Sequence, residues 1–375
     1  MKIGIITIHK SQVNYGASLQ SFALWKFISD QGNDCEIIDL LRPCHSDYKV
    51  SRSLGENGKS WKQKIIVWVK KSIKKTDLPD WIIERRRKFC DFNQLAKYSR
   101  KFRSVEELFK ASFDYDIYIT GSDQVWNPKM PFINEPYFLT FAPQGKKRVS
   151  YASSFGIDSI PQEFKPQYSN WLTQYDQLST RENRGAYIVE ELLGKRPKVV
   201  LDPVFLLKSS VWGKYMQKVP EVEPKNYVFV YMLRYDERII NHAIALAEKH
   251  QKPLYMVLSE EKAVEHPAVK QLFSIGPSEW LWLVANADIF VTSSFHGTAF
   301  SIIFNTPFVV LLQNGVPTNN RIIDLLSSME LIGNQFDINM SSSEWGHLTI
   351  PQADCSRNYL EMYRESCDYL IKALS

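Results

Sequence analysis

The sequence has few of the features that mark secreted, metal-binding or membrane-spanning proteins. Its five cysteines form no CxxC pair and no cluster with histidine at metal-ligand spacing, which predicts reduced thiols and no structural zinc site. No apolar run approaches the roughly 18 residues of a membrane span. The N-terminal stretch turns polar after Ile8, too early for the apolar region of a signal peptide. We therefore expect a soluble, cytoplasmic protein.

Familiar nucleotide-binding and catalytic motifs are also absent. The sequence contains no GxGxxG after its first predicted strand and no GxxxxGK followed by Ser or Thr, so it indicates neither a dinucleotide site nor a P-loop. GxSxG and HExxH are missing as well. The DYD at 114–116 resembles the DxD of metal-dependent glycosyltransferases, but it precedes a predicted strand where that motif should follow one. We predict no catalytic metal and no cofactor.

The pattern that is present is typical of an α/β protein. Apolar residues make up 44% and charged residues 23% of the 375, as in ordinary globular proteins. Short β-branched runs alternate with helical patterns, which predicts parallel sheets built from βαβ units. The first series has strands at 2–8, 35–40, 117–120, 149–152 and 199–201, with a helix at 17–30. The second has strands at 227–232, 254–258, 289–292 and 308–312, with helices at 236–249, 278–286 and 297–304.

Two such series predict two doubly wound, Rossmann-like domains. The break is expected after Asp202, because the following Pro203 disfavours helix at the preceding residue. The N-terminal domain is then 1–203 and the C-terminal domain 204–350. The last segment, 351–375, contains a helix at 356–373, for which packing back on the N-terminal domain is one arrangement.

Positive charge is concentrated in one segment. Residues 59–103 hold fifteen Lys/Arg and four Asp/Glu, a net charge of +11, whereas the whole chain carries +5. The rest is therefore −6, and bulk charge does not indicate a nucleic-acid partner. Within the segment, Trp61, Ile65, Trp68 and Val69 share one face of a predicted helix, away from the lysines. Two interpretations stay open: peripheral contact with the inner face of an anionic membrane, or an insertion packed on the N-terminal domain.

Ligands of open α/β sheets bind beyond the carboxyl ends of the strands. This rule indicates three polar loops, 9–16, 121–127 and 293–298, which we expect to line one cleft. The last leads into an apolar helix, whose first N–H groups favour an anion. His296 would face that anion as a charged donor or proton shuttle. The alternative is that Ser294 caps the helix and His296 is structural.

Two arginines open other predicted helices. Arg181, in STRE at 179–182, could grip a carboxylate or phosphate with two hydrogen bonds. The alternative is a surface arrangement with Glu182. Arg321 is a second candidate of the same kind.

The remaining polar loops offer groups for a hydroxyl-bearing ligand. Asp123 could act as a general base on a hydroxyl, or cap a turn. Trp126 could stack on a sugar ring. Gly16 permits close approach to the backbone, and Asn14 offers both an amide donor and an acceptor.

Seven segments, in this order and spacing, resemble the polysaccharide pyruvyl transferase family: NYGASLQ (14–20), ITGSDQVWNP (119–128), YASSFG (151–156), LSTRE (178–182), VLDPVFLL (200–207), GPSEW (276–280) and TSSFHGTAFSIIF (292–304). The resemblance implies two Rossmann-like domains facing a cleft, similar to GT-B glycosyltransferases, with a C-terminal donor domain. It also implies transfer of pyruvate from phosphoenolpyruvate to two hydroxyls of a saccharide as a cyclic ketal, in capsule or exopolysaccharide synthesis.

The family places its motif histidine and an arginine in the donor site, and these correspond to His296 and Arg181. With them we expect catalytic roles for His296 and Asp123, and donor contacts from Arg181, Ser294, Gly297, Thr298 and Arg321. Acceptor contacts are expected from Asn14, Tyr15, Gly16, Ser122, Trp126 and Asn127. Family members often carry arginine two positions before the histidine, where this chain has Ser294. Either Arg321 substitutes for it or the donor differs.

Two other functions stay open. One is a GT-B-type glycosyltransferase that uses a nucleotide sugar, for which the C-terminal half carries no signature. The other is a non-catalytic saccharide-binding or assembly protein, with Ser294 as the sign of lost donor chemistry.

Overall fold

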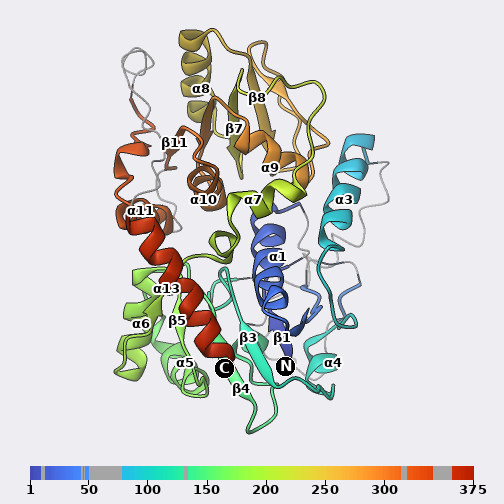
Figure 1. The fold of residues 1–375 in the computed structure, drawn as a ribbon, viewed down its shortest axis with the longest axis vertical. Coiled ribbons are helices and arrows are strands. Elements are labelled where there is room, and N and C mark those ends of the chain that lie inside the picture. The colour runs from blue at the N-terminus through green and yellow to red at the C-terminus, as the bar shows by residue number, and fades with distance from the viewer. Residues whose placement is uncertain are drawn as a thin grey trace.

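A computed structural model describes residues 1–9, 13–43, 45, 47–49, 78–130, 134–313, 319–340 and 357–375. Their strands form two main parallel sheets, one on each side of Asp202 in the chain (Figure 1). We call residues 1–203 the N-terminal half and residues 204–340 the C-terminal half. The α/β class and the two Rossmann-like parallel sheets that the sequence predicts are confirmed.

The N-terminal sheet has the strand order β2-β1-β3-β4. Its strands are β1 (Lys2–Ile6), β2 (Asp34–Ile37), β3 (Ile117–Thr120) and β4 (Lys147–Ser150), and the short parallel pair β5 (Ser179–Thr180) and β6 (Lys198–Val199) lies beside it. Its helices are α1 (Tyr15–Asp30), α3 (Asp80–Asn93), α4 (Val105–Phe109), α5 (Lys165–Leu172) and α6 (Asn183–Leu193). Short 3-10 helices occur at Glu135–Phe138 and Gln162–Phe164.

The C-terminal sheet has the order β12-β11-β10-β7-β8-β9. Its strands are β7 (Val228–Met232), β8 (Leu254–Leu258), β9 (Lys270–Gln271), β10 (Ile289–Thr292), β11 (Phe308–Leu311) and β12 (Gln335–Phe336). Its helices are α7 (Ser209–Trp212), α8 (Glu237–His250), α9 (Pro277–Ala285), α10 (Phe295–Phe304) and α11 (Asn319–Ser328), with 3-10 helices η3 (Pro203–Leu206), η4 (Gly213–Tyr215) and η5 (Ile332–Asn334).

The strand order determines where loops gather. In the N-terminal sheet the connections run outward from β1 and β3, and in the C-terminal sheet they run outward from β7 and β10. Such switch points leave room for ligands beyond the carboxyl ends of the two strands. The loops that follow β1, β3 and β10 are the three polar loops of the sequence.

Two helices contact parts of the structure that are distant from them in the chain. α13 (Arg357–Leu374) lies along the N-terminal half in Figure 1, where its Ser366 Oγ accepts the Leu201 N–H (2.9 Å) and its Tyr369 hydroxyl donates to the Ser150 carbonyl (2.9 Å). In the other direction, α3 reaches the C-terminal half. Its buried Arg85 donates to the Leu258 carbonyl (2.7 Å).

Two of the cations of α3 pair with acids of the C-terminal half. Arg86 forms two hydrogen bonds with Glu261, at 2.8 and 2.6 Å, and Lys88 lies 2.5 Å from Glu279. This part of the basic segment therefore contacts both halves. The predicted amphipathic face, with Trp61 and its neighbours, lies outside the described residues. Among the helices that are described, none has both the length and the apolar character that a membrane crossing requires.

Candidate functional site

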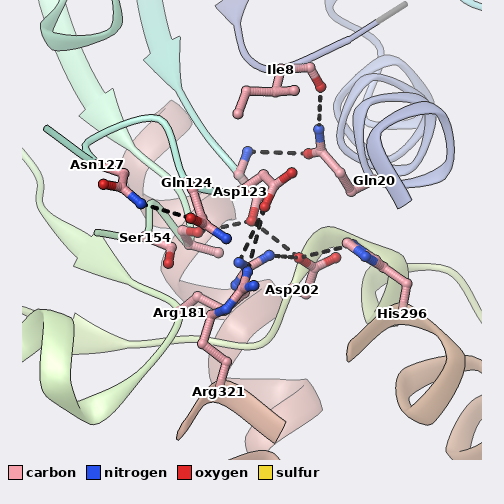
Figure 2. Close-up of polar contacts among 12 residues, drawn as sticks. Ile8, Gln20, Asp123, Gln124, Asn127, Ser154, Arg181, Asp202, His296 and Arg321 are labelled. Atoms are coloured by element: carbon pink, nitrogen blue, oxygen red, sulfur yellow. Dashed lines mark hydrogen bonds and ion pairs between the residues drawn. The ribbon is translucent and has the colours of Figure 1, made fainter. Parts of the chain in front are cut away.

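Five charged or titratable side chains from five separate segments converge between the two sheets (Figure 2). They are Asp123, Arg181, Asp202, His296 and Arg321. Four of them were expected at the site from the sequence, and the structure brings all four together. We refer to the five as the polar cluster.

Arg181 lies at the centre of the polar cluster. It is the first residue after β5, and its side chain is only 1% exposed. Nη1 donates to Asp202 Oδ2 (2.7 Å) and Nη2 to Asp123 Oδ1 (3.3 Å), while the guanidinium carbon lies 4.6 Å from the centre of the Phe295 ring. Burial lowers the pKa of Arg181, but the surrounding carboxylates outweigh it and raise the pKa. Arg181 is therefore a fixed cation.

Asp202 is a site residue that the sequence analysis missed. It caps η3 by accepting the Val204 N–H (3.1 Å), and its side chain is fully buried. Burial raises the pKa of this carboxyl, but the proximity of His296 and Arg181 outweighs burial and holds the pKa well below its usual range. The residue follows a predicted strand at 199–201. The rule that sites gather at the carboxyl ends of strands points to Asp202, but the sequence analysis interpreted Asp202 and Pro203 only as the break between domains.

His296 approaches Asp202 from the C-terminal half. Its Nε2 lies 3.7 Å from Asp202 Oδ2 and has no hydrogen-bond partner among the described residues. Ser294 caps α10 by accepting the Gly297 N–H (3.3 Å), as one of the two interpretations predicted. The cap and the placement of His296 in the cluster occur together, so the two interpretations do not exclude each other.

Gly16 makes the position of His296 possible. A Cβ atom at residue 16 would lie 2.2 Å from His296 Nδ1 and 2.6 Å from Cε1. The close approach expected at Gly16 is therefore occupied by the histidine ring. The NYGASLQ and TSSFHG segments, 280 positions apart at these two residues, meet at this contact.

Arg321 supplies a second guanidinium from α11. Its Nη1 lies 3.6 Å from Asp123 Oδ1, and its Nε is buried without a hydrogen-bond partner among the described residues. Burial and the charge of Arg181 lower the pKa of Arg321 to about 10, although nearby carboxylates oppose this. Two like charges are thus held close together, an arrangement that an anionic ligand would stabilise.

Asp123 joins the two arginines through one oxygen. Burial raises its pKa, but Arg181, Arg321 and His296 outweigh burial and lower it. Its contacts with Arg181 and Arg321 indicate that it holds the two guanidinium groups in place. The role of Asp123 as a general base stays a prediction.

Glu182 is a third buried carboxyl beside Arg181, not the surface partner that one interpretation proposed. Its Oε1 accepts a hydrogen bond from Ser154 Oγ (2.8 Å), and its Oε2 lies 3.8 Å from Arg181 Nε. Neither Glu182 Oε2 nor Arg181 Nε has a hydrogen-bond partner among the described residues. Burial raises the pKa of Glu182 against the opposing charges of Arg181 and Arg321.

Several predicted acceptor residues are structural. Trp126 is fully buried, with its ring stacked on Phe138 (5.5 Å) and its Nε1 donating to the Tyr137 carbonyl (3.1 Å). Tyr15 is also fully buried, and its hydroxyl donates to the Ile275 carbonyl (2.7 Å). Neither ring has an exposed face, so the expected contacts with a sugar do not fit these positions.

The other predicted acceptor residues lie in or beside the loops. Asn14 caps α1 by accepting the Ala17 N–H (3.1 Å), and Asn127 donates to Gln124 Oε1 (2.8 Å). Ser122 reaches the cluster, with Oγ 3.1 Å from Asp202 Oδ2. Gln20, which the sequence analysis did not single out, ties two loops together. It donates to the Ile8 carbonyl (2.8 Å) and accepts the Ser122 N–H (3.2 Å).

The cluster combines buried cations with a histidine that touches solvent. Arg181 and Asp202 lie deepest, whereas the side chains of His296 and Arg321 are 12% exposed. Nitrogen atoms without hydrogen-bond partners occur on both arginines and on His296. This arrangement can bind an anion and move a proton beside it. Among the described residues, no group of three or more His, Cys, Asp or Glu side chains could hold a metal ion.

Comparisons with known proteins bear on the family. The model of the polysaccharide pyruvyl transferase family matches residues 14–314. No curated protein matches the chain significantly. Similar solved structures include the UDP-GlcNAc 2-epimerases of Neisseria meningitidis (9% identity, 100% of this chain and 99% of the other, TM-score 0.47) and Methanocaldococcus jannaschii (10%, 100% and 99%, 0.48). Another is AviGT4, a glycosyltransferase involved in avilamycin A biosynthesis (11%, 100% and 96%, 0.49). Because the family match spans most of the chain, the protein belongs to the polysaccharide pyruvyl transferase family and is a transferase.

Proposed function

We propose that the protein transfers pyruvate from phosphoenolpyruvate to a pair of saccharide hydroxyls as a cyclic ketal, in capsule or exopolysaccharide synthesis. The observation that carries this proposal is the convergence of Arg181, Arg321 and His296, each with a buried nitrogen that lacks a hydrogen-bond partner among the described residues. Phosphoenolpyruvate carries a carboxylate and a phosphate, and guanidinium groups bind both with paired hydrogen bonds. The acceptor could be carried by a lipid.

The chain has cations to replace the arginine that many family members carry at the position of Ser294. The Ser294 hydroxyl caps α10 at 3.3 Å from the Gly297 N–H, so it supports the helix start and adds no charge. Arg321 approaches the same cluster from α11 and supplies a charge there. We therefore assign donor binding to Arg181 and Arg321 together. The N–H groups of Gly297 and Thr298, which the sequence placed at the donor, already donate to the Oγ (3.3 Å) and the carbonyl (2.9 Å) of Ser294, so we do not assign them to the donor.

The reaction needs protons to move in both directions. A proton added to the methylene carbon of phosphoenolpyruvate makes a methyl group and leaves the neighbouring carbon electrophilic. One sugar oxygen bonds to that carbon and loses its proton, and phosphate then departs with the electron pair of its C–O bond. The second hydroxyl oxygen closes the ring and also loses its proton. The products are the ketal and inorganic phosphate.

His296 is the group best placed for these transfers. Its ring touches solvent, and its Nε2 faces the buried carboxylate of Asp202 at 3.7 Å. A carboxylate beside an imidazole fixes the orientation of the ring and stabilises its charged form. His296 can then give up a proton to the donor and accept one from the sugar hydroxyl.

The test is to incubate the purified protein with phosphoenolpyruvate and a panel of saccharide acceptors. We expect acceptor-dependent release of phosphate and a product whose mass equals the acceptor plus pyruvate less one water. His296→Ala and Arg181→Ala should remove both signals. A raised melting temperature with a nucleotide sugar, and none with phosphoenolpyruvate, would instead support glycosyl transfer. Ligand at 100 times Kd adds about 2.7 kcal/mol of stability, enough to detect.

A further inference from the structure

Helix α3 places a buried arginine between the two halves. Arg85 is 2% exposed, and its Nη2 donates to the Leu258 carbonyl (2.7 Å) and to the Tyr15 hydroxyl (3.1 Å). Both acceptors are neutral, and the Nε of Arg85 is buried without a hydrogen-bond partner among the described residues. Leu258 is the last residue of β8, and Tyr15 is the first residue of α1. Arg85 therefore joins the start of α1 to the carboxyl end of a strand in the C-terminal half.

The Tyr15 side chain continues this connection. A hydroxyl has one proton to donate, and that of Tyr15 goes to the Ile275 carbonyl (2.7 Å), while its oxygen accepts from Arg85. The ring of Tyr15 is fully buried, with its centre 4.8 Å from that of Phe89 on α3 and 5.4 Å from that of Trp280 on α9. The first residue of α1 is thus held against the C-terminal half through both its ring and its hydroxyl.

A second hydrogen bond fixes the same segment of backbone. Ser259, the residue after β8, donates from Oγ to the Val13 carbonyl (3.0 Å). Gly16 follows Tyr15 directly, and it is the residue at which a Cβ would lie 2.2 Å from His296 Nδ1. The contacts at Val13 and Tyr15 therefore determine where the backbone meets the imidazole ring.

The His296 ring lies between two groups of the N-terminal half. Gly16 is close to Nδ1, and the carboxylate of Asp202 lies 3.7 Å from Nε2. The ring itself belongs to α10 of the C-terminal half. If the start of α1 moved relative to the C-terminal half, the ring would lose its contact with Gly16 and could shift relative to Asp202. The hydrogen bonds of Arg85 oppose that movement.

We propose that Arg85 is a positioning residue that acts through Tyr15 to hold the start of α1 against the C-terminal half, and so keeps the His296 ring beside Asp202. This rests on the proposed function, in which His296 moves the protons. Misplacing a reacting group slows the chemical step even when the substrate still binds. The proposal also gives α3, the described helix of the basic segment, a role in the site.

The experiment compares Tyr15→Phe, Arg85→Met and Arg85→Lys with the control Arg87→Ala. Arg87 lies on the same helix, but its side chain bonds to Glu84 and Asp91 of α3 itself. Tyr15→Phe and Arg85→Met should lower kcat about tenfold, equivalent to about 1.4 kcal/mol. The KM for phosphoenolpyruvate should stay within a factor of about two, because the donor-binding arginines are unchanged. Arg85→Lys keeps a charged donor and should recover part of kcat, and Arg87→Ala should match the wild type.

A double-mutant cycle tests whether Arg85 acts through Tyr15. The variant Tyr15→Phe/Arg85→Met should lose no more kcat than Arg85→Met alone, because both changes remove the same hydrogen bond. Additive losses, or a raised KM with unchanged kcat, would overturn the proposal. If Arg85→Met does not fold, Tyr15→Phe decides, since it keeps the ring in the core; wild-type kcat in that variant would overturn the proposal as well.

The NMR signals of the His296 ring separate this proposal from the proposed function. The chain has seven histidines, and His296→Ala identifies which ring nitrogen signals belong to His296. Tyr15→Phe and Arg85→Met should shift these signals, and Arg87→Ala should not. Should the wild type fail to turn over phosphoenolpyruvate, the proposed reaction is wrong, and the ring signals still test the positioning role. His296 signals that are the same in Tyr15→Phe, Arg85→Met and the wild type would overturn it.

Discussion

Replacing Gly16 by alanine tests the contact between α1 and His296. The added Cβ would lie 2.2, 2.6 and 2.8 Å from Nδ1, Cε1 and Cγ of the ring, against an ordinary contact of about 3.4 Å or more. The ring must therefore move by about 1 Å. Since Gly16 is the second residue of α1, alanine alone would stabilise the helix by about 0.5–1 kcal/mol. Forcing extra atoms into a packed site costs about 1–3 kcal/mol, so we expect net destabilisation.

In the His296→Ala background, we expect the effect of Gly16→Ala on stability to change from destabilising to stabilising. With the imidazole removed, the new methyl group has no ring to clash with, and only the gain in helix propensity remains. Gly16→Ala should then stabilise the protein by about 0.5–1 kcal/mol, measured by denaturant unfolding. Gly213→Ala is the matched control, because a Cβ there meets nothing within 4 Å and its φ of −53° suits alanine.

Activity provides the second measurement. A displacement of about 1 Å in a reacting group can lower turnover about 100-fold. Gly16→Ala should therefore lose most of its acceptor-dependent phosphate release, while Gly213→Ala retains it. Wild-type stability and turnover in Gly16→Ala, or the same destabilisation with and without the His296 ring, would refute the close contact that we describe.

Three further predictions concern charge. Arg181→Ala should be destabilised by about 3–5 kcal/mol as well as inactive, because Asp123 and Asp202 lose the cation they surround; unfolding like the wild type would contradict the burial of this charge. The pKa values of Asp123 and Asp202 lie below the ordinary 3.8, so both carboxylates stabilise the fold above about pH 4, and this stabilisation is lost as the pH falls. Asp202→Asn should therefore make the free energy of unfolding depend less on pH in the acid range. Finally, if the basic segment 59–103 contacts membranes, the protein should co-sediment with anionic vesicles at low salt and dissociate at high salt; no binding at low salt would exclude that contact.

The sequence predicted well the elements whose pattern depends on burial alone. Strands β3, β8 and β10 match their predicted limits to the residue, because each is a continuous apolar run buried on both faces. The carboxyl-end rule likewise found the loops that carry His296 and Asp123. These features depend on short-range patterns that a single sequence contains.

What the sequence could not predict depends on which side chains meet in space. Trp126 lies in a polar loop, yet its ring turns into the core, and composition does not reveal that direction. Asp202 and Glu182 belong to the site only because each contacts Arg181. Asp202 is 21 positions from Arg181 in the chain, and Glu182 is next to it. The contact of Gly16 with His296 joins the two halves, and no local pattern encodes it.

The contacts of α3 and α13 limit how this protein can be recombined with its relatives. A chimera joined only after Pro203 would give α13 a foreign sequence, and the Leu201 N–H and Ser150 carbonyl would lose their partners Ser366 and Tyr369. The C-terminal half is better exchanged as an internal cassette with two crossover points, one near Pro203 and one before Arg357. Such a cassette must also preserve acids at Glu261 and Glu279, the partners of α3.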